Sequence, residues 1–83
     1  MPRRVVERVQ TGVRLERRMV KVLKGLAEYL EMSLGDLLEG VVLHAFEGKS
    51  PFSPETLEAI ERLREVYGLD LTAQDSHGLE ELP

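Results

Sequence analysis

Three consecutive residues near the carboxyl end of the sequence are types that serve in catalysis. Asp75, Ser76 and His77 are the types of a nucleophilic triad, in which a carboxylate orients an imidazole that activates a hydroxyl. Neighbours in sequence do not generally converge in space, and residues 73–83 have the acidic, polar composition of a poorly ordered tail. A disordered tail offers no oxyanion site, so we do not expect catalysis there.

His44 is the other histidine, and it is a metal ligand only if acidic partners accompany it. Glu39 and Glu47, three residues further on, do not make a recognisable ligand set. The absence of cysteine excludes disulfides, thiolate metal sites and a cysteine nucleophile. No glycine-rich phosphate loop follows a strand. The sequence therefore predicts neither an enzyme nor a bound cofactor or metal ion.

Residues 8–15 alternate between two kinds of side chain. The basic and polar positions are Arg8, Gln10, Gly12 and Arg14. The intervening, mostly apolar positions are Val9, Thr11, Val13 and Leu15. This period of two is typical of a half-buried strand, with one apolar face and one basic face.

A lone strand leaves its backbone N–H and C=O groups unpaired, and no later stretch of the chain resembles a partner strand. The same stretch in a second copy can pair with it about a two-fold axis, which gives a closed, symmetric contact. The sequence therefore predicts an obligate homodimer with an intermolecular two-stranded ribbon that turns Arg and Gln outward.

Charge is divided unevenly along the 83 residues, although the net charge is only −4. Residues 1–24 hold eight basic side chains against two acidic ones, a balance of +6, and residues 25–83 hold three against thirteen, a balance of −10. Screening limits such charges to about 8 Å at physiological salt, so the local field decides what a surface attracts. The amino-terminal segment is therefore expected to attract anions.

Helical periodicity follows the strand, and it predicts a first amphipathic helix from Arg17 to about Glu31. Gly25 weakens this helix, and a close backbone crossing is one explanation for its presence. Ser33 is a good N-cap for a second helix from Leu34 to about Glu47. The apolar arc of this helix is too wide for one neighbour, so a second copy is expected to cover it. The predicted dimer core is Val13, Leu15, Leu37, Leu38, Val41 and Val42.

Ser53 and Pro54 give a strong start signal for a third helix that runs to about Tyr67. Packing on the dimer explains its apolar stripe, and a surface for a partner protein is the alternative. The chain is thus divided into a basic arm (1–8), a core domain (9–48), a carboxyl-terminal helix with its extension (49–72) and an acidic tail (73–83).

The order of one strand, a tight turn and two helices joined by a Ser-capped turn resembles the ribbon-helix-helix (Arc/methionine-repressor-like) family of DNA-binding proteins. The likeness covers about residues 9–47, and its carriers are Val13-Arg14-Leu15, Met19, the run from Leu23 to Ala27, Met32-Ser33 and Leu37-Leu38. The resemblance implies a mainly α fold with one short strand, a dimeric ribbon in the DNA major groove, and here an added third helix.

The resemblance also assigns roles to individual residues. The implied base-contacting positions are Arg8, Gln10, Gly12 and Arg14, and Gly12 departs from the family pattern because it has no side chain to read a base. The implied phosphate contacts are Ser33, Leu34, Gly35, Arg17, Arg18 and Lys21. Apart from the resemblance, the basic arm adds Arg3 and Arg4 as candidate phosphate contacts, and a mobile amino terminus is the alternative. Asp36, in the first turn of the second helix, partly opposes a phosphate at that turn.

The sequence thus predicts a homodimeric, sequence-specific DNA-binding protein that acts as a transcriptional repressor. Two alternatives stay open: an antitoxin whose carboxyl-terminal helix binds a toxin, and a dimeric adaptor without a DNA role. Residues 1–24 hold no long apolar run and no stretch of about 18 apolar residues occurs, so we expect a soluble cytoplasmic protein, nucleoid-associated when bound to DNA.

Overall fold

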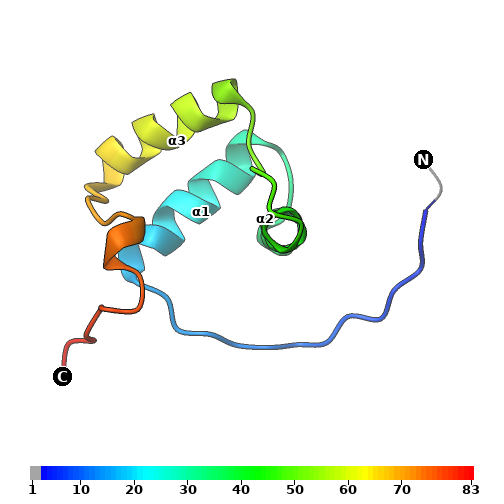
Figure 1. Cartoon of the computed structure of the whole chain (residues 1–83), viewed down its shortest axis with the longest axis horizontal. Helices are drawn as coiled ribbons and strands as arrows, with labels where there is room; N and C mark the ends of the chain where they lie inside the picture. Colours follow the sequence, from blue (N-terminus) through cyan, green and yellow to red (C-terminus); the bar gives the residue numbers. More distant parts are fainter. Residues whose placement is uncertain (1–2) are drawn as a thin grey trace.

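A computed structural model describes residues 3–83, so the first two residues of the predicted basic arm (1–8) lie outside the described part. The elements are α1 (Arg17–Tyr29), α2 (Leu34–Phe46), α3 (Pro54–Tyr67) and a short 3₁₀ helix, η1 (Ala73–Asp75) (Figure 1). The three predicted helices are confirmed, with ends that differ by two residues at most. Within residues 3–83, no helix is both long and apolar enough to cross a membrane.

Local capping bonds explain where α2 and α3 begin. The Ser33 hydroxyl accepts a hydrogen bond from the amide of Asp36 at 3.1 Å, and the Ser53 hydroxyl accepts one from the amide of Thr56 at 3.2 Å. Each bond satisfies an amide that has no partner inside its helix. Gly68 ends α3 in the left-handed conformation, with a φ of 65°, which glycine adopts without steric cost.

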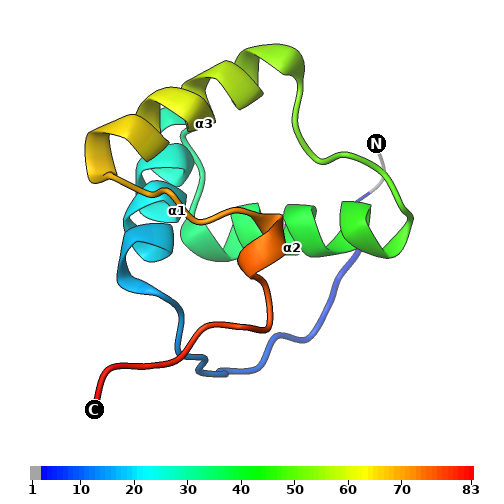
Figure 2. The same cartoon turned by 60° about the vertical axis from the view of Figure 1, so that its left-hand side comes forward.

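The helix α1 lies between the other two and provides most of the core. Figure 1 shows α1 and α3 side by side and α2 end-on, and Figure 2 shows α2 from its side. Leu26 is the most deeply buried large side chain, and it clusters with Ala27 of α1 and Leu37 of α2. Partly buried apolar side chains surround this cluster: Leu23, Leu30, Met32, Val41, Phe52, Ile60 and Leu63.

Gly25 lies where α3 packs closely against α1. A Cβ atom built at this position lies 3.0 Å from a terminal methyl of Leu63 and 3.8 Å from the ring of Tyr67. The missing side chain lets Leu63 pack directly on the backbone of α1. The explanation that the sequence offers for this glycine, a close crossing, is therefore confirmed.

The predicted fold class is wrong, because residues 3–83 contain three α-helices, one short 3₁₀ helix and no strand. Residues 9–15 belong to an irregular segment, residues 3–16, which runs outside the helices (Figure 1). The alternation of side chains describes two faces of an extended chain, but a strand also needs a partner edge. None of the described residues supplies that edge, so the intermolecular ribbon and the ribbon-helix-helix dimer built on it are not supported by this structure.

The chain exposes more surface than a compact protein of its size. Its accessible surface is 7620 Å² for a mass of 9.4 kDa, against about 5,000 Å² for a typical folded monomer of that mass. Part of the excess comes from residues 3–16, where Val13 is 75% exposed. Another part comes from the carboxyl-terminal half of α2, which leaves Val42, Leu43 and Phe46 in contact with solvent.

Candidate nucleic-acid interface

The residues expected to contact bases all lie in the irregular segment, residues 3–16, and all of them are exposed: Arg8, Gln10, Gly12 and Arg14. Arg3 and Arg4, expected to contact phosphate, are exposed in the same segment. Figure 1 shows this segment (blue) running from the start of α1 past α2. The structure therefore places the predicted base-contacting residues on one continuous, accessible stretch.

Arg8 attaches this segment to α2. Its Nε atom lies 2.8 Å from Oε2 of Glu39, and its Nη2 atom lies 2.9 Å from Oε1 of the same carboxylate. These hydrogen bonds and the positive charge lower the pKa of Glu39 below its ordinary value. The two parallel bonds have the planar geometry in which arginine also binds phosphate or the edge of guanine.

Arg14 makes a second pair of this kind, with the acidic tail. Its Nε atom donates a hydrogen bond of 3.0 Å to Oε1 of Glu81, and its Nη2 group donates to Oε2. Both side chains stay largely in solvent. Within the tail that the sequence predicts to be disordered, residues 73–75 form the helix η1, and Glu81 contacts the amino-terminal segment.

The guanidinium of Arg18 is hydrogen-bonded to other residues of the same chain. Its guanidinium donates to Glu16 at 3.0 Å, to the carbonyl oxygen of Gly68 at 2.9 Å and to Asp70 at 3.0 Å. It therefore fixes the connection after α3 against the start of α1. The resemblance assigns Arg18 to a DNA phosphate, but in the folded chain this half-buried side chain has a structural role.

Glu16 shapes the entry into α1. Its carboxylate caps the helix by accepting hydrogen bonds from the amides of Arg18 and Met19, at 3.0 and 3.1 Å. Desolvation acts to raise the pKa of Glu16, but these bonds and the Arg18 side chain outweigh it and lower the pKa below its ordinary value. The carboxylate is therefore ionised at neutral pH, and it fixes the point where the irregular segment becomes helical.

The remaining basic side chains of this region are accessible. Arg3, Arg4, Arg17 and Lys24 are exposed and form no ion pair with another described residue. Lys21 is exposed as well, with its ammonium 5.7 Å from the centre of the Tyr67 ring. These five side chains supply the positive charge that is available to an external anion.

The predicted phosphate turn at Ser33, Leu34 and Gly35 forms the first turn of α2. The Ser33 hydroxyl is used as the helix cap, and Asp36 places a carboxylate in the same turn. We call the exposed stretch of residues 3–16 the basic segment. Within residues 3–83, no hydrogen bond or ion pair joins the turn at Ser33 to this basic segment. Of the predicted phosphate contacts, Arg3 and Arg4 thus share a segment with the predicted base contacts, whereas the turn at Ser33 belongs to α2, which Arg8 contacts only through Glu39.

The predicted dimer-core residues differ widely in their exposure. Leu37 is already buried within the single chain, and Leu38 and Val41 are half-buried on α2. Val42 remains exposed on the same helix, as do Val13 and Leu15 before α1. Only part of the predicted set is therefore available to a second copy.

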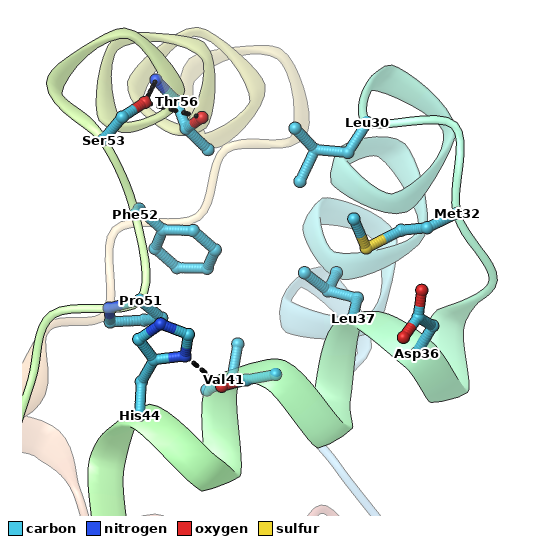
Figure 3. Close-up of a pocket in the computed structure, with 11 residues that line it drawn as sticks. Leu30, Met32, Asp36, Leu37, Val41, His44, Pro51, Phe52, Ser53 and Thr56 are labelled. Atoms are coloured by element: carbon cyan, nitrogen blue, oxygen red, sulfur yellow. Dashed lines mark hydrogen bonds between the residues drawn. The ribbon is translucent and has the colours of Figure 1, made fainter. Parts of the chain in front are cut away.

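A cavity of about 410 Å³ opens between α2 and the segment that leads into α3. Figure 3 shows its apolar wall, formed largely by Leu30, Met32, Leu37, Val41 and Phe52. His44 lies at its rim, where Nδ1 is 2.7 Å from the carbonyl oxygen of Gly40. In the part of the chain that the structure covers, no three potential metal-ligating side chains come together.

Sequence reasoning missed the acidic partners of the basic segment, Glu39 and Glu81. The signal available was the charge division itself, since a segment of +6 folds against a remainder of −10. Comparison with protein-family models, curated proteins and solved structures finds no match to this chain. Its residues and geometry therefore carry the functional interpretation.

Proposed function

We propose that the chain is a sequence-specific DNA-binding protein that acts as a homodimer and represses transcription in the cytoplasm, at the nucleoid. The observation that carries this proposal is the exposed basic segment, in which Arg14, Gln10 and the charges around them are accessible on one stretch. The lysines and arginines attract the phosphate backbone, a sequence-independent contribution to affinity. Arg14 and Gln10 supply side chains that can distinguish guanine and adenine in the major groove.

Gly12 supports a close approach of this segment to a ligand. A Cβ atom built on it meets nothing within 4 Å, so packing within the chain does not require glycine there. A missing side chain between two reading positions lets the backbone come near the edges of the bases. The binding partner, rather than the fold, then explains the glycine.

The large exposed surface supports the homodimer. Stable protein interfaces bury about 800 Å² on each partner, and this chain exposes far more than that beyond the surface of a compact monomer. The apolar row on α2, which we define as Val42, Leu43 and Phe46, is the part of this surface best suited to burial. Two copies joined there present two basic segments to one DNA duplex.

Binding to DNA fragments at several salt concentrations tests the proposal. In fluorescence anisotropy with fragments selected from genomic DNA, the affinity should fall steeply as salt rises. Replacing Arg17 with alanine should reduce the salt slope by about 1, and replacing Arg14 should weaken discrimination by about 1–3 kcal/mol at one position per half-site. The matched control is Arg62→Ala, which removes an exposed charge from α3. A dimer that shows no salt-dependent binding would refute DNA binding and favour an adaptor.

Replacing Gly12 with alanine separates a DNA role from a folding role. The midpoint of thermal unfolding should stay within about 1 °C, because the added methyl has open space and its energetic effect is small. Binding to the selected fragments should weaken, since the methyl separates the segment from the bases. Circular dichroism and anisotropy on the same preparation measure the two effects. Unchanged DNA affinity would contradict a close approach at Gly12.

A second candidate function is the binding of a protein partner, as in an antitoxin. Leu57 and Val66, at two different positions around α3, are exposed on a helix that is already formed. Apolar side chains on a preformed helix suit a protein groove. Co-purification of a second small protein with the tagged chain, lost on Val66→Asp, would favour this function over DNA binding alone.

A further inference from the structure

The two ends of the described chain carry opposite charge and meet in the folded protein. The basic segment approaches the tail where Arg14 contacts Glu81, 67 positions later in the sequence. Figure 2 shows the tail (red) passing beside the amino-terminal segment (blue) before α1. The acidic tail thus contacts Arg14, the residue to which we assign base recognition.

The Arg14–Glu81 pair uses the donors that DNA would use. The Nε and Nη2 groups of Arg14 both point at one carboxylate, the same fork that binds a phosphate or the O6 and N7 atoms of guanine. A guanidinium engaged in this way cannot make those bonds to a nucleic acid at the same time. The tail and DNA therefore exclude each other at Arg14.

The tail begins from a position that the fold fixes. Arg64 of α3 donates a hydrogen bond of 3.0 Å to the carbonyl oxygen of Leu71, and Arg18 binds Gly68 and Asp70 just before it. The helix η1 follows immediately, and its capping bond runs from the amide of Thr72 to the Asp75 carboxylate at 2.8 Å. These bonds start the tail beside the amino-terminal end of α1, within reach of the basic segment.

Apolar side chains accompany the ion pair. A groove of about 840 Å³ separates the two segments, and its apolar lining is Val13, Leu15, Val20, Leu71, Leu79 and Leu82. Arg17 and Glu80 also line it. The groove is open and Arg14 and Glu81 are 82% and 65% exposed, so the tail rests on the basic segment without being buried there.

We propose that residues 79–82 are an internal competitor for DNA, in which Glu81 binds the guanidinium of Arg14 in the free protein and is displaced when DNA binds. This inference rests on the DNA-binding function proposed above. The tail offers the Glu81 carboxylate to Arg14, whose guanidinium binds no other carboxylate among the described residues, and Glu80 lines the adjoining groove. Because the contact is exposed, the tail weakens DNA binding to a limited extent and does not abolish it.

Replacing Glu81 with glutamine removes the competing charge without shortening the chain. At 50 mM salt, the affinity for a labelled 30-base-pair duplex of mixed sequence should rise about threefold to fivefold, as expected for the loss of an exposed ion pair. The gain should shrink as salt rises, because the Arg14–Glu81 pair is itself screened. The matched control is Glu58→Gln on α3, which makes the same change in net charge away from the basic segment.

The double variant Arg14→Ala, Glu81→Gln tests whether the effect passes through Arg14. With Arg14 absent, the glutamine at position 81 should give no further gain, so the two substitutions should be non-additive. Equal gains from Glu81→Gln and Glu58→Gln would reduce the effect to net charge and overturn the proposal. Unchanged affinity in Glu81→Gln, while the parent protein binds DNA, would overturn it as well.

A readout without DNA separates this proposal from the proposed function. The NMR signal of the Arg14 side-chain Nε–H group should move on Glu81→Gln and stay in place on Glu58→Gln, because only Glu81 accepts its proton. If that signal moves but neither protein binds DNA at any salt, DNA binding fails and competition for it fails with it. If DNA binds and the signal does not move, the tail contact alone is wrong.

Discussion

Replacing Leu43 and Phe46 together with aspartate is expected to hold the protein as a monomer. The two side chains are 64% and 82% exposed in the single chain, and burial of each large apolar side chain contributes about 1.5–3 kcal/mol. A symmetric contact loses them from both copies and gains four carboxylates in an apolar interface. The dimer should therefore weaken by more than about 4 kcal/mol, a thousandfold in the dissociation constant. Sedimentation equilibrium measures this change directly.

The matched control for this double variant is Val66→Asp, which places a carboxylate on an exposed apolar position of α3. It should leave the association state unchanged. Circular dichroism should show the same helix content in all three proteins, because none of the replaced side chains belongs to the core. DNA affinity should fall with the loss of the dimer, since one basic segment then replaces two. A parent protein that sediments as a monomer at high concentration would contradict the proposed dimer.

Replacing Leu26 with alanine is expected to cost about 3–5 kcal/mol of unfolding free energy. Leu26 is 2% exposed, and it lies in the only cluster of buried side chains found within residues 3–83. Domains of this size are stable by about 5–15 kcal/mol, so a loss of this amount removes a large share of the unfolding free energy. Urea unfolding followed by circular dichroism, at one fixed protein concentration, measures the difference.

Leu57→Ala provides the comparison for Leu26, because it removes the same atoms from a half-exposed position on α3. Its cost should stay below about 1 kcal/mol, since little apolar surface returns to water and no closed cavity forms. A larger loss at Leu57 than at Leu26 would show that the core is centred elsewhere, or that a second copy covers α3.

The helices could be predicted from sequence because their signals are local. Ser33 and Ser53 each cap a helix through an amide three residues away, and Gly68 ends α3 through its own backbone angle. Gly25 was informative for a similar reason, because a residue of poor helix propensity inside a strongly amphipathic helix needs an explanation. The capping features depend on a few neighbouring residues, whereas the explanation for Gly25 lies in Leu63 and Tyr67 of α3.

The alternation in residues 9–15 could not show whether a strand forms, because a strand also needs a partner edge, which the alternation does not specify. The period of two in residues 9–15 describes the two faces of an extended chain, and no described residue pairs with its backbone. The candidate site likewise has a part that local sequence predicts and a part that depends on distant residues. Its exposed basic residues follow from composition, whereas the Arg8–Glu39 and Arg14–Glu81 pairs join positions 31 and 67 residues apart.

The clamp formed by Arg18 and Arg64 on residues 68–71 has a consequence for behaviour at low abundance. The tail belongs to the same chain as Arg14, and these hydrogen bonds hold its start beside α1, so dilution leaves the occupancy of the tail contact unchanged, while any association between copies declines. A cell that holds few copies would then contain mainly single chains with the Arg14–Glu81 contact formed, and rising synthesis would favour the proposed pairs, whose two basic segments together bring more charge to one DNA duplex and help it to displace the tails. Concentration itself would set the threshold.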